Sequence, residues 1–358
     1  MKGNRQMVDQ KNISKIYGAI SDEVSRKVFC SRLLYSLTGD QSLIQWMMDD
    51  FERDAENDVK WLALKRRILN LTEKPYIFGM GAYGKILCDK VGGPDTWRGF
   101  IDNSPMSDVC MGLPVIKASD FLKKYSGENI ALPSKAFLFE MREQLLDAGI
   151  PEECIIDATA WYDATEGRQY FDLPYLTYGE DEVFVDGGSC DGMSSVRFAE
   201  QCHGKYEKIY CFEPDRKNIV RLKQNFQSRN IGNYEIIDKG LWNERQELTF
   251  AANGAANSRI TEVGVDNAEK IEVTSLDEIL RGQRVSFIKM DIEGAEYKAL
   301  QGAQKIIVDH KPKLAICVYH KPQDIWELPG AILDMRSDYK LYFRHYSSRN
   351  IETVMYAL

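Results

Sequence analysis

The sequence predicts an α/β protein whose open parallel sheet is closed at one edge by an antiparallel pair. An apolar, β-branched run enters a glycine-rich turn at residues 183–192, and a segment of helical composition follows it. Apolar strands that end in acidic residues then alternate with helical segments, as in nucleotide-binding α/β sheets. Strands expected at 339–346 and 352–357 are joined by so short a loop that they must be antiparallel.

The length of 358 residues predicts two or three domains, since about 100–200 residues form one domain. We expect an N-terminal helical region at 1–73, a small Rossmann-like α/β module at 74–160, a polar linker at 161–180 and the main domain at 181–358. The helical region shows apolar residues at helical spacing but no catalytic constellation. Its helices are therefore expected to supply packing or a dimer surface.

Composition and charge argue against several classes of protein. A net charge of −8 without a Lys- or Arg-rich run disfavours nucleic-acid binding, which needs a basic face. Eight cysteines without a C-x-x-C pair indicate reduced thiols rather than a disulfide framework. The N-terminus lacks a signal peptide's apolar core, and no apolar run reaches the ~20 residues of a membrane span. We expect a cytoplasmic protein with neither nucleic-acid nor membrane partners, and a homo-oligomer is compatible with the sequence.

A formal G-x-G-x-x-G motif lies at Gly79–Gly84, between a predicted strand and a helix predicted at Lys85–Val91. The next apolar strand ends at Asp102, near the acidic position expected about 20 residues on. Two interpretations stay open. The module could be a shrunken Rossmann-like fold with a vestigial site, or it could bind a nucleotide or nucleotide-sugar at Gly79–Gly84 with Asp102 on a ribose.

The turn after the strand at 183–187 has a different spacing. It reads D-x-G-x-x-x-G from Asp186 to Gly192, which is typical of S-adenosylmethionine (SAM) sites rather than of hydride cofactors. Glycines let the backbone approach a ligand closely, and the following helix start offers free N–H groups. The residues expected to bind the cofactor lie here and at the next two strand ends: Asp186, Gly187, Gly188, Ser189, Asp191, Gly192, Glu213, Pro214, Asp238 and Gly240.

Glu213 follows the second strand of the main domain, expected at 208–212. An acid at this position can accept hydrogen bonds from both ribose hydroxyls of an adenosine. The alternative is that Glu213 only caps the helix that begins near Arg216. Because the turn, the strand and the acid occur together at the expected distance, ribose binding is the favoured interpretation.

The α/β alternation breaks after the third strand, expected at 234–237. Strands at 247–250 and 270–274 enclose the Gly/Asn/Ser segment 253–258. This insertion could be a lid that selects the substrate, or a plain surface hairpin. A parallel sheet closed by an antiparallel pair is the class I methyltransferase arrangement, whereas the sheet of a nicotinamide dehydrogenase would normally continue in parallel βα units.

The candidate catalytic residues follow the fourth and fifth strands, at the sheet edge where ligands bind. Asp291 and Glu293 could orient an acceptor or the methionine ammonium, or could cap the following helix. His320 has a pKa suited to a general base, although it could also only hydrogen-bond to backbone. A divalent metal on these three residues is geometrically conceivable, but we predict none. His345, inside a terminal strand, is expected to be structural.

Four segments carry a resemblance to a known family. They are Val-Phe-Val-Asp-Gly-Gly at 183–188, Cys-Phe-Glu-Pro-Asp at 211–215, Phe-Ile-Lys-Met-Asp-Ile-Glu-Gly-Ala-Glu at 287–296, and the closing strands from 341. In these the sequence resembles the FkbM-type SAM-dependent methyltransferases over roughly 181–358, and upstream it looks like an N-terminal extension of some bacterial members. The resemblance implies an O-methyltransferase of natural-product or sugar hydroxyls.

Three hypotheses about function follow. The first is a SAM-dependent O-methyltransferase acting on a hydroxyl of a sugar, glycan or related metabolite, with Asp291, Glu293 and His320 as the catalytic residues. The second is a nucleotide-sugar or NAD-dependent enzyme centred on Gly79–Gly84. The third is a non-catalytic protein that binds SAM as a sensor or scaffold.

Overall fold

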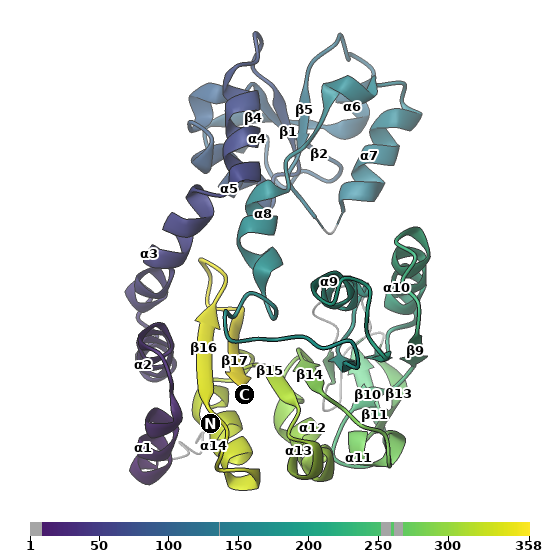
Figure 1. The fold of residues 1–358 in the computed structure, drawn as a ribbon. Coiled ribbons are helices and arrows are strands. Elements are labelled where there is room, and N and C mark those ends of the chain that lie inside the picture. The colour runs from purple at the N-terminus through teal and green to yellow at the C-terminus, as the bar shows by residue number, and fades with distance from the viewer. Residues whose placement is uncertain (1–8, 136, 252–258, 261–267) are drawn as a thin grey trace. The chain divides into compact units, whose positions relative to one another are not determined.

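A computed structural model describes residues 9–135, 137–251, 259–260 and 268–358 (Figure 1). The chain forms two compact units. The larger unit contains residues up to 48 together with 169–358, and the smaller unit contains residues 49–168. None of the described helices is both long and apolar enough to cross a membrane.

The larger unit is built on a seven-stranded sheet of order β16-β17-β15-β14-β7-β8-β9. Its parallel strands are β7 (Val183–Gly187), β8 (Lys208–Phe212), β9 (Tyr234–Ile237), β14 (Phe287–Met290) and β15 (Lys313–Cys317). β17 (Thr353–Ala357) runs antiparallel to β15, and β16 (Leu341–His345) runs antiparallel to β17. The predicted parallel sheet closed by an antiparallel pair is confirmed.

Helices cover both faces of this sheet (Figure 1). They include α9 (Met193–Gln201), α10 (Arg216–Ser228), α11 (Leu276–Ile279), α12 (Glu296–Gln301), α13 (Gln304–His310) and α14 (Asp324–Met335). The single helix expected after β14 is divided into α12 and α13 at Gly302. A Cβ at Gly302 would lie 2.1 Å from the backbone oxygen of Trp242, so close packing explains the glycine at this break.

A second, smaller sheet follows β9 in the order β10-β13-β11-β12. Its strands are β10 (Gly240–Leu241), β11 (Gln246–Ala251), β12 (Arg259–Ile260) and β13 (Ala268–Thr274). The two strands predicted at 247–250 and 270–274 are confirmed as β11 and β13, which pair antiparallel. The segment 253–258, expected to be a lid or surface hairpin, lies outside the described residues.

The first helices pack against the closing strands and α14 of the larger unit. They are α1 (Gln10–Ala19) and α2 (Glu23–Thr38), while α3 (Ser42–Glu56) spans the division between the units. Ser25 accepts a hydrogen bond from the Phe343 N–H at 2.9 Å, and Arg344 forms an ion pair with Asp22 at 2.9 Å. The N-terminal helices therefore do not form the separate region expected at 1–73, because their apolar side chains share the core of the larger unit.

Phe29 gives a direct test of this packing. Its side chain is 1% exposed and contacts Phe343 with ring centroids 5.2 Å apart. Phe29→Leu is expected to lower the free energy of unfolding of the larger unit by roughly 1–2 kcal/mol, because the smaller side chain leaves a void. Urea unfolding of the full chain measures the change, with the exposed Leu37→Ala as the control that should change little. Equal stability of the two variants would contradict the packing.

The smaller unit is a Rossmann-like module with sheet order β3-β4-β2-β1-β5-β6. Its strands are β1 (Tyr76–Phe78), β2 (Gly99–Asp102), β3 (Val109–Cys110), β4 (Leu113–Lys117), β5 (Ile130–Leu132) and β6 (Ile155–Asp157). Its helices are α4 (Val59–Leu69), α5 (Ala82–Lys90), α6 (Ala118–Leu122), α7 (Leu138–Asp147) and α8 (Ala160–Ala164). All pairs except β3–β4 are parallel, as expected for this module.

The segment predicted as a polar linker at 161–180 belongs partly to each core. Trp161 is buried in the smaller unit and packs edge-on against Trp61. In the larger unit Tyr170, Phe171 and Leu173 are buried, and Phe171 contacts the rings of three other phenylalanines. The Asp, Thr and Tyr content suggested a connector, but these large apolar side chains bury too much surface to lie in a free linker.

Candidate functional site

The turn after β7 is held close to the neighbouring strand end. Gly188 has φ of +72°, and a Cβ there would lie 2.0 Å from the carbonyl oxygen of Asp291. Gly192 begins α9 at φ +80°, and a Cβ there would meet side chains of α10 at 2.7 Å. Cys190 also adopts a positive φ of +49°. The glycines are therefore required by backbone conformation and close packing together.

Asp186 is fully buried beneath this turn, and its carboxylate supports the turn from inside. Its Oδ2 accepts hydrogen bonds from the hydroxyls of Ser194 and Ser195 at 2.6 and 2.7 Å. Its Oδ1 lies 3.1 Å from the Nζ of Lys289, a side chain that is 3% exposed. Lys289 also donates to the carbonyl oxygens of Gly187 and Gly188 at 3.1 and 2.7 Å. Asp186, predicted to bind the cofactor, thus holds the loop in shape rather than lining open space.

Glu213 lies at the end of β8, as the sequence predicted, and closes the turn from the opposite side. Its Oε2 accepts a hydrogen bond from the Cys190 N–H, and its Oε1 accepts one from the Asp215 N–H, each at 2.8 Å. Asp215, rather than Glu213, caps α10 by accepting from the Lys217 N–H. Burial raises the pKa of Glu213 to about 7, although the two N–H donors oppose that shift.

The other predicted cofactor residues lie in the glycine turn and after the ends of β8 and β9. Gly188 and Asp191 are partly exposed on the open face of the turn, whereas the Ser189 hydroxyl is buried and donates to the Asp186 carbonyl at 2.8 Å. Pro214 packs near Gly240, where an added Cβ would lie 4.0 Å from the Pro214 ring. Asp238 is exposed at the end of β9. Some side chains of the predicted cofactor residues are therefore exposed to solvent, and others are buried and support the turn.

The candidate catalytic residues lie together at the carboxyl ends of β14 and β15. The Nε2 of His320 lies 3.3 Å from Asp291 Oδ1 and 3.9 Å from Glu293 Oε2. The Nδ1 of the same ring lies 3.0 Å from Oε1 of Glu296, which is buried. The side chains of Asp291 and Glu293 are 23% and 25% exposed, so their carboxylate groups form the solvent-facing side of the cluster.

These contacts fix the charge state of the cluster. Burial disfavours a charged imidazole, yet Glu296 and Asp291 outweigh it and hold the pKa of His320 well above its usual value. Burial would raise the pKa of Asp291, but His320 and Lys289 hold it well below its ordinary range. At neutral pH His320 is therefore a cation between carboxylates. The predicted role as a neutral general base does not fit this state.

Several residues of the site were missed by sequence reasoning. The Tyr170 hydroxyl donates to Asp291 Oδ2 at 2.7 Å, and the Tyr319 hydroxyl donates to Asp291 Oδ1 at 3.2 Å. Tyr170 comes from the supposed linker, so no strand-end position marked it. Lys289 and Glu296 carried a signal, because the K-x-D-x-E-G-x-E run at 289–296 contains both. Lys289 lies in β14, and Asp291 directly follows the last residue of that strand.

His345 has the structural role that the sequence predicted. Its Nδ1 lies 2.7 Å from the Thr353 hydroxyl, and its Nε2 lies 3.0 Å from the Arg349 carbonyl. Burial lowers its pKa to about 3. A neutral ring with both nitrogens engaged inside the closing hairpin has no free group for chemistry.

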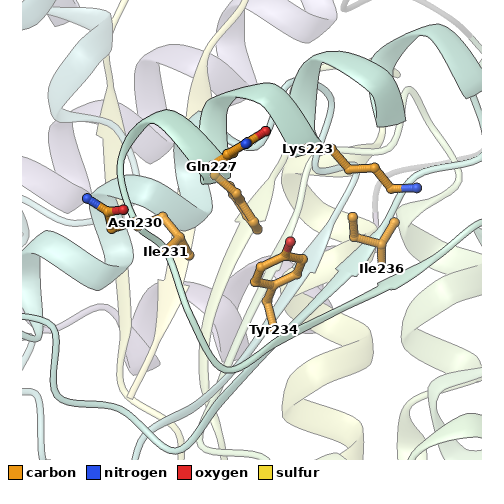
Figure 2. Close-up of a pocket in the computed structure, with 7 residues that line it drawn as sticks. Lys223, Gln227, Asn230, Ile231, Tyr234 and Ile236 are labelled. Atoms are coloured by element: carbon orange, nitrogen blue, oxygen red, sulfur yellow. The ribbon is translucent and has the colours of Figure 1, made fainter.

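A groove of about 740 Å³ lies on another part of the larger unit (Figure 2). Figure 2 shows side chains of α10 such as Lys223 and Gln227 beside Tyr234 of β9. The groove follows the last turns of α10 and the edge strand β9. It does not include the turn at Gly188 or the carboxylate cluster, so it is separate from the candidate site.

Comparison with protein families decides the identity of this domain. The model of the methyltransferase FkbM domain matches residues 186–341, which include the glycine turn, Glu213 and the carboxylate cluster. The chain contains an FkbM-type methyltransferase domain. Within it, the K-x-D-x-E-G-x-E run provides the buried Lys289 and the carboxylates around His320. No curated protein matches the chain at a significant level.

The chain is also similar to several solved structures, each with a TM-score below 0.5. A methyltransferase FkbM from Methylobacillus flagellatus KT is 20% identical, with a TM-score of 0.48 over 89% of this chain and 100% of its own. An rRNA methylase from Streptococcus thermophilus is 16% identical, with a TM-score of 0.32 over 50% and 86%. Aeropyrum pernix fibrillarin with natively bound S-adenosyl-L-methionine is 12% identical, with a TM-score of 0.33 over 52% and 70%.

Proposed function

We propose that the chain is a SAM-dependent O-methyltransferase that acts on a hydroxyl of a sugar, glycan or related metabolite. The observation that carries the proposal is the juxtaposition at one sheet edge within the FkbM domain. The glycine turn closes on the buried Glu213, and partly exposed carboxylates cluster at the ends of the adjoining strands. Ligands of open α/β sheets bind at this edge.

The chain's residues fit SAM at the turn. α9 begins at Gly192, which has no side chain to cap the helix; Asp191 Oδ1 accepts from the Met193 N–H at 3.2 Å, and the next N–H groups of the first turn point toward the same end of the helix. Glu213 can accept hydrogen bonds from ribose hydroxyls with its remaining lone pairs. Asp186 and Lys289 keep the turn in shape. When bound, SAM would supply a methyl group on a positively charged sulfur.

The carboxylate cluster suits a hydroxyl acceptor. Asp291 and Glu293 are acceptor-only groups and can hold the O–H hydrogens of a polyol. We propose that these carboxylates orient the acceptor, whose proton leaves to solvent as the O–C bond forms, and that His320 positions them. Alignment of the acceptor oxygen with the methyl group supplies much of the rate in such a displacement.

A methyl-transfer screen with labelled SAM tests the proposal. The wild-type chain would be incubated with a panel of sugars, nucleotide sugars and glycan extracts, with the Glu213→Ala variant as the matched control. We expect label to appear in a hydroxyl-bearing acceptor with the wild type and to fall sharply with the variant. Transfer to an amine or carbon acceptor, with none to any hydroxyl, would contradict the O-methyl assignment.

The raised pKa of Glu213 predicts a pH dependence of cofactor binding. Deprotonation provides the carboxylate that accepts from ribose, so affinity rises as the pH passes upward through about 7. If only the ionised form binds well, the affinity for S-adenosylhomocysteine (SAH) increases about tenfold between pH 6 and 8. Calorimetry at both pH values measures this, and Glu213→Gln should remove the dependence. An unchanged wild-type affinity would contradict the role of Glu213.

One observation favours a second candidate activity in the smaller unit. Asp102 Oδ2 accepts a hydrogen bond from the Met80 N–H in the glycine loop at 2.9 Å, which matches the contact of Glu213 with Cys190. This supports a nucleotide or nucleotide-sugar site at Gly79–Gly84. Thermal shift assays with NAD(H), UDP-sugars and SAM separate the candidates. Stabilisation by a UDP-sugar that is lost in Asp102→Ala would support the second site, and no response to any nucleotide would exclude it.

A further inference from the structure

We propose that His320, Asp291 and Glu293 form a site for one divalent cation of the Mg²⁺ or Mn²⁺ class. Glu296 acts as a positioning residue on the far side of the His320 ring. The inference rests on the proposed function, because the ion would bind the acceptor oxygen at the same site. It replaces the expectation from sequence that no metal is bound.

The distances within the cluster fit shared coordination. Among the described residues, Asp291, His320 and the positioning residue Glu296 offer atoms that all lie within 4.8 Å of one another, and Glu293 borders this group through the His320 ring. The Nε2 of His320 lies 3.3 Å from Asp291 and 3.9 Å from Glu293. Ligands about 2.1 Å from one octahedral ion stand about 3 Å apart, so these atoms need to move little to surround an ion.

The orientation of the His320 ring is the independent observation. Its side chain is 8% exposed, yet neither ring nitrogen makes a hydrogen bond with acceptable geometry within the described part of the chain. Carboxylate oxygens nevertheless lie at 3.0 and 3.3 Å, so the ring is aimed into the cluster without being aligned on single oxygens. A buried nitrogen that points between two carboxylates is suited to a ligand that all three share.

Glu296 completes the arrangement from behind. Its side chain is 1% exposed, its Oε1 accepts from the Ile292 N–H at 2.9 Å, and the same oxygen lies 3.0 Å from His320 Nδ1. A histidine that binds a metal through one nitrogen usually donates its other N–H to a carboxylate, which fixes the ring. Glu296 lies 3.0 Å from Nδ1 without an aligned hydrogen bond in this state, so Nε2, on the side of the exposed carboxylates, is the nitrogen for the ion.

The donor set selects the class of ion. Two carboxylates and one imidazole, with no thiolate, suit Mg²⁺ or Mn²⁺, which keep further positions for water or substrate oxygens. An ion here takes the place of the proton on Nε2 and neutralises the carboxylates as that proton does. It would also lower the pKa of a bound acceptor hydroxyl. The hydroxyl proton then leaves to solvent, and the O–C bond forms while the methyl C–S bond breaks with its electron pair on sulfur.

Mn²⁺ binding to the chelator-treated full chain tests the site, because free and bound Mn²⁺ differ in their electron paramagnetic resonance signals. We expect one saturable site in the wild type. His320→Ala and Asp291→Asn should each weaken binding at least tenfold, and Glu296→Gln should weaken it roughly 10–100-fold. His203→Asn, which changes an exposed histidine of the same unit, should bind as the wild type does.

Two results would overturn the site: no saturable Mn²⁺ binding by the wild type, or unchanged binding in both His320→Ala and Asp291→Asn. Circular dichroism of each variant shows whether it is folded, and Glu293→Gln offers a more exposed second replacement. SAH binding by the wild type in the presence of EDTA separates the two proposals. If SAH binds and Mn²⁺ does not, the metal site fails and the proposed function stands; if Mn²⁺ binds and SAH does not, the proposed function fails.

Discussion

Replacing Lys289 with methionine is expected to lower the free energy of unfolding of the larger unit by about 3–5 kcal/mol. The ammonium is almost fully buried and contacts Asp186 at 3.1 Å together with two carbonyl oxygens of the glycine turn. Its removal leaves the carboxylate of Asp186 buried without its charge partner. Burial works against the charged lysine, but Asp186 and Asp291 keep its pKa above the ordinary value, so Lys289 is charged at neutral pH.

Urea unfolding of the full chain measures this loss. Lys305→Met removes an exposed lysine from the same unit and should change the stability by no more than about 0.5 kcal/mol. Asp186→Asn combined with Lys289→Met removes both charges and should recover part of the loss, because no buried charge remains unpaired. A Lys289→Met variant as stable as the Lys305→Met control would show that the pair does not support the turn.

His320→Gln is expected to slow methyl transfer by about 10²–10⁴-fold. The positively charged ring lies between Asp291, Glu293 and Glu296, so its loss leaves three carboxylates in repulsion and misplaces the groups that hold the acceptor. In the described part of the chain, the ion pairs of His320 are with Asp291, Glu293 and Glu296 rather than with the glycine turn or Glu213. Affinity for SAH should therefore change less than about threefold.

The kinetic parameters separate this role from a general loss of structure. A variant that is only less stable would lose SAH binding and activity together, whereas loss of positioning lowers kcat with SAH affinity kept. His203→Gln is the matched control on an exposed histidine and should keep both. A His320→Gln variant with full kcat would contradict the role of the cluster.

The sequence predicts the sheet well because its strands are marked by local patterns. The apolar runs before Asp186, Glu213 and Asp291 are β7, β8 and β14, and the short loop near the C-terminus required an antiparallel pair. The predicted acids lie at strand ends, so their meeting at one edge follows from the parallel connection rule. His320 also lies in the cluster, one sheet position further along.

The parts that sequence reasoning missed depend on contacts between distant segments. Tyr170 is 121 residues from Asp291 in the chain. The composition of the segment around it predicted a polar connector, whereas the structure buries its aromatic rings in the core. The apolar residues of the first helices are spaced as in any amphipathic helix. The sequence of α2 alone therefore does not show that this helix packs on β16. The ionisation of His320 likewise follows from carboxylates that only the fold brings to its ring.

Binding of SAH by calorimetry tests the central claim that the turn at 186–192 and Glu213 form a SAM site. The folded wild type is expected to bind one SAH with saturable heat at pH 8. Glu213→Ala should weaken this at least tenfold, because the ribose loses its acceptor, and Asp186→Ala together with Glu213→Ala should abolish it. Folded wild-type protein that binds no SAH, or a double variant that binds it as well as the wild type does, would contradict the claim.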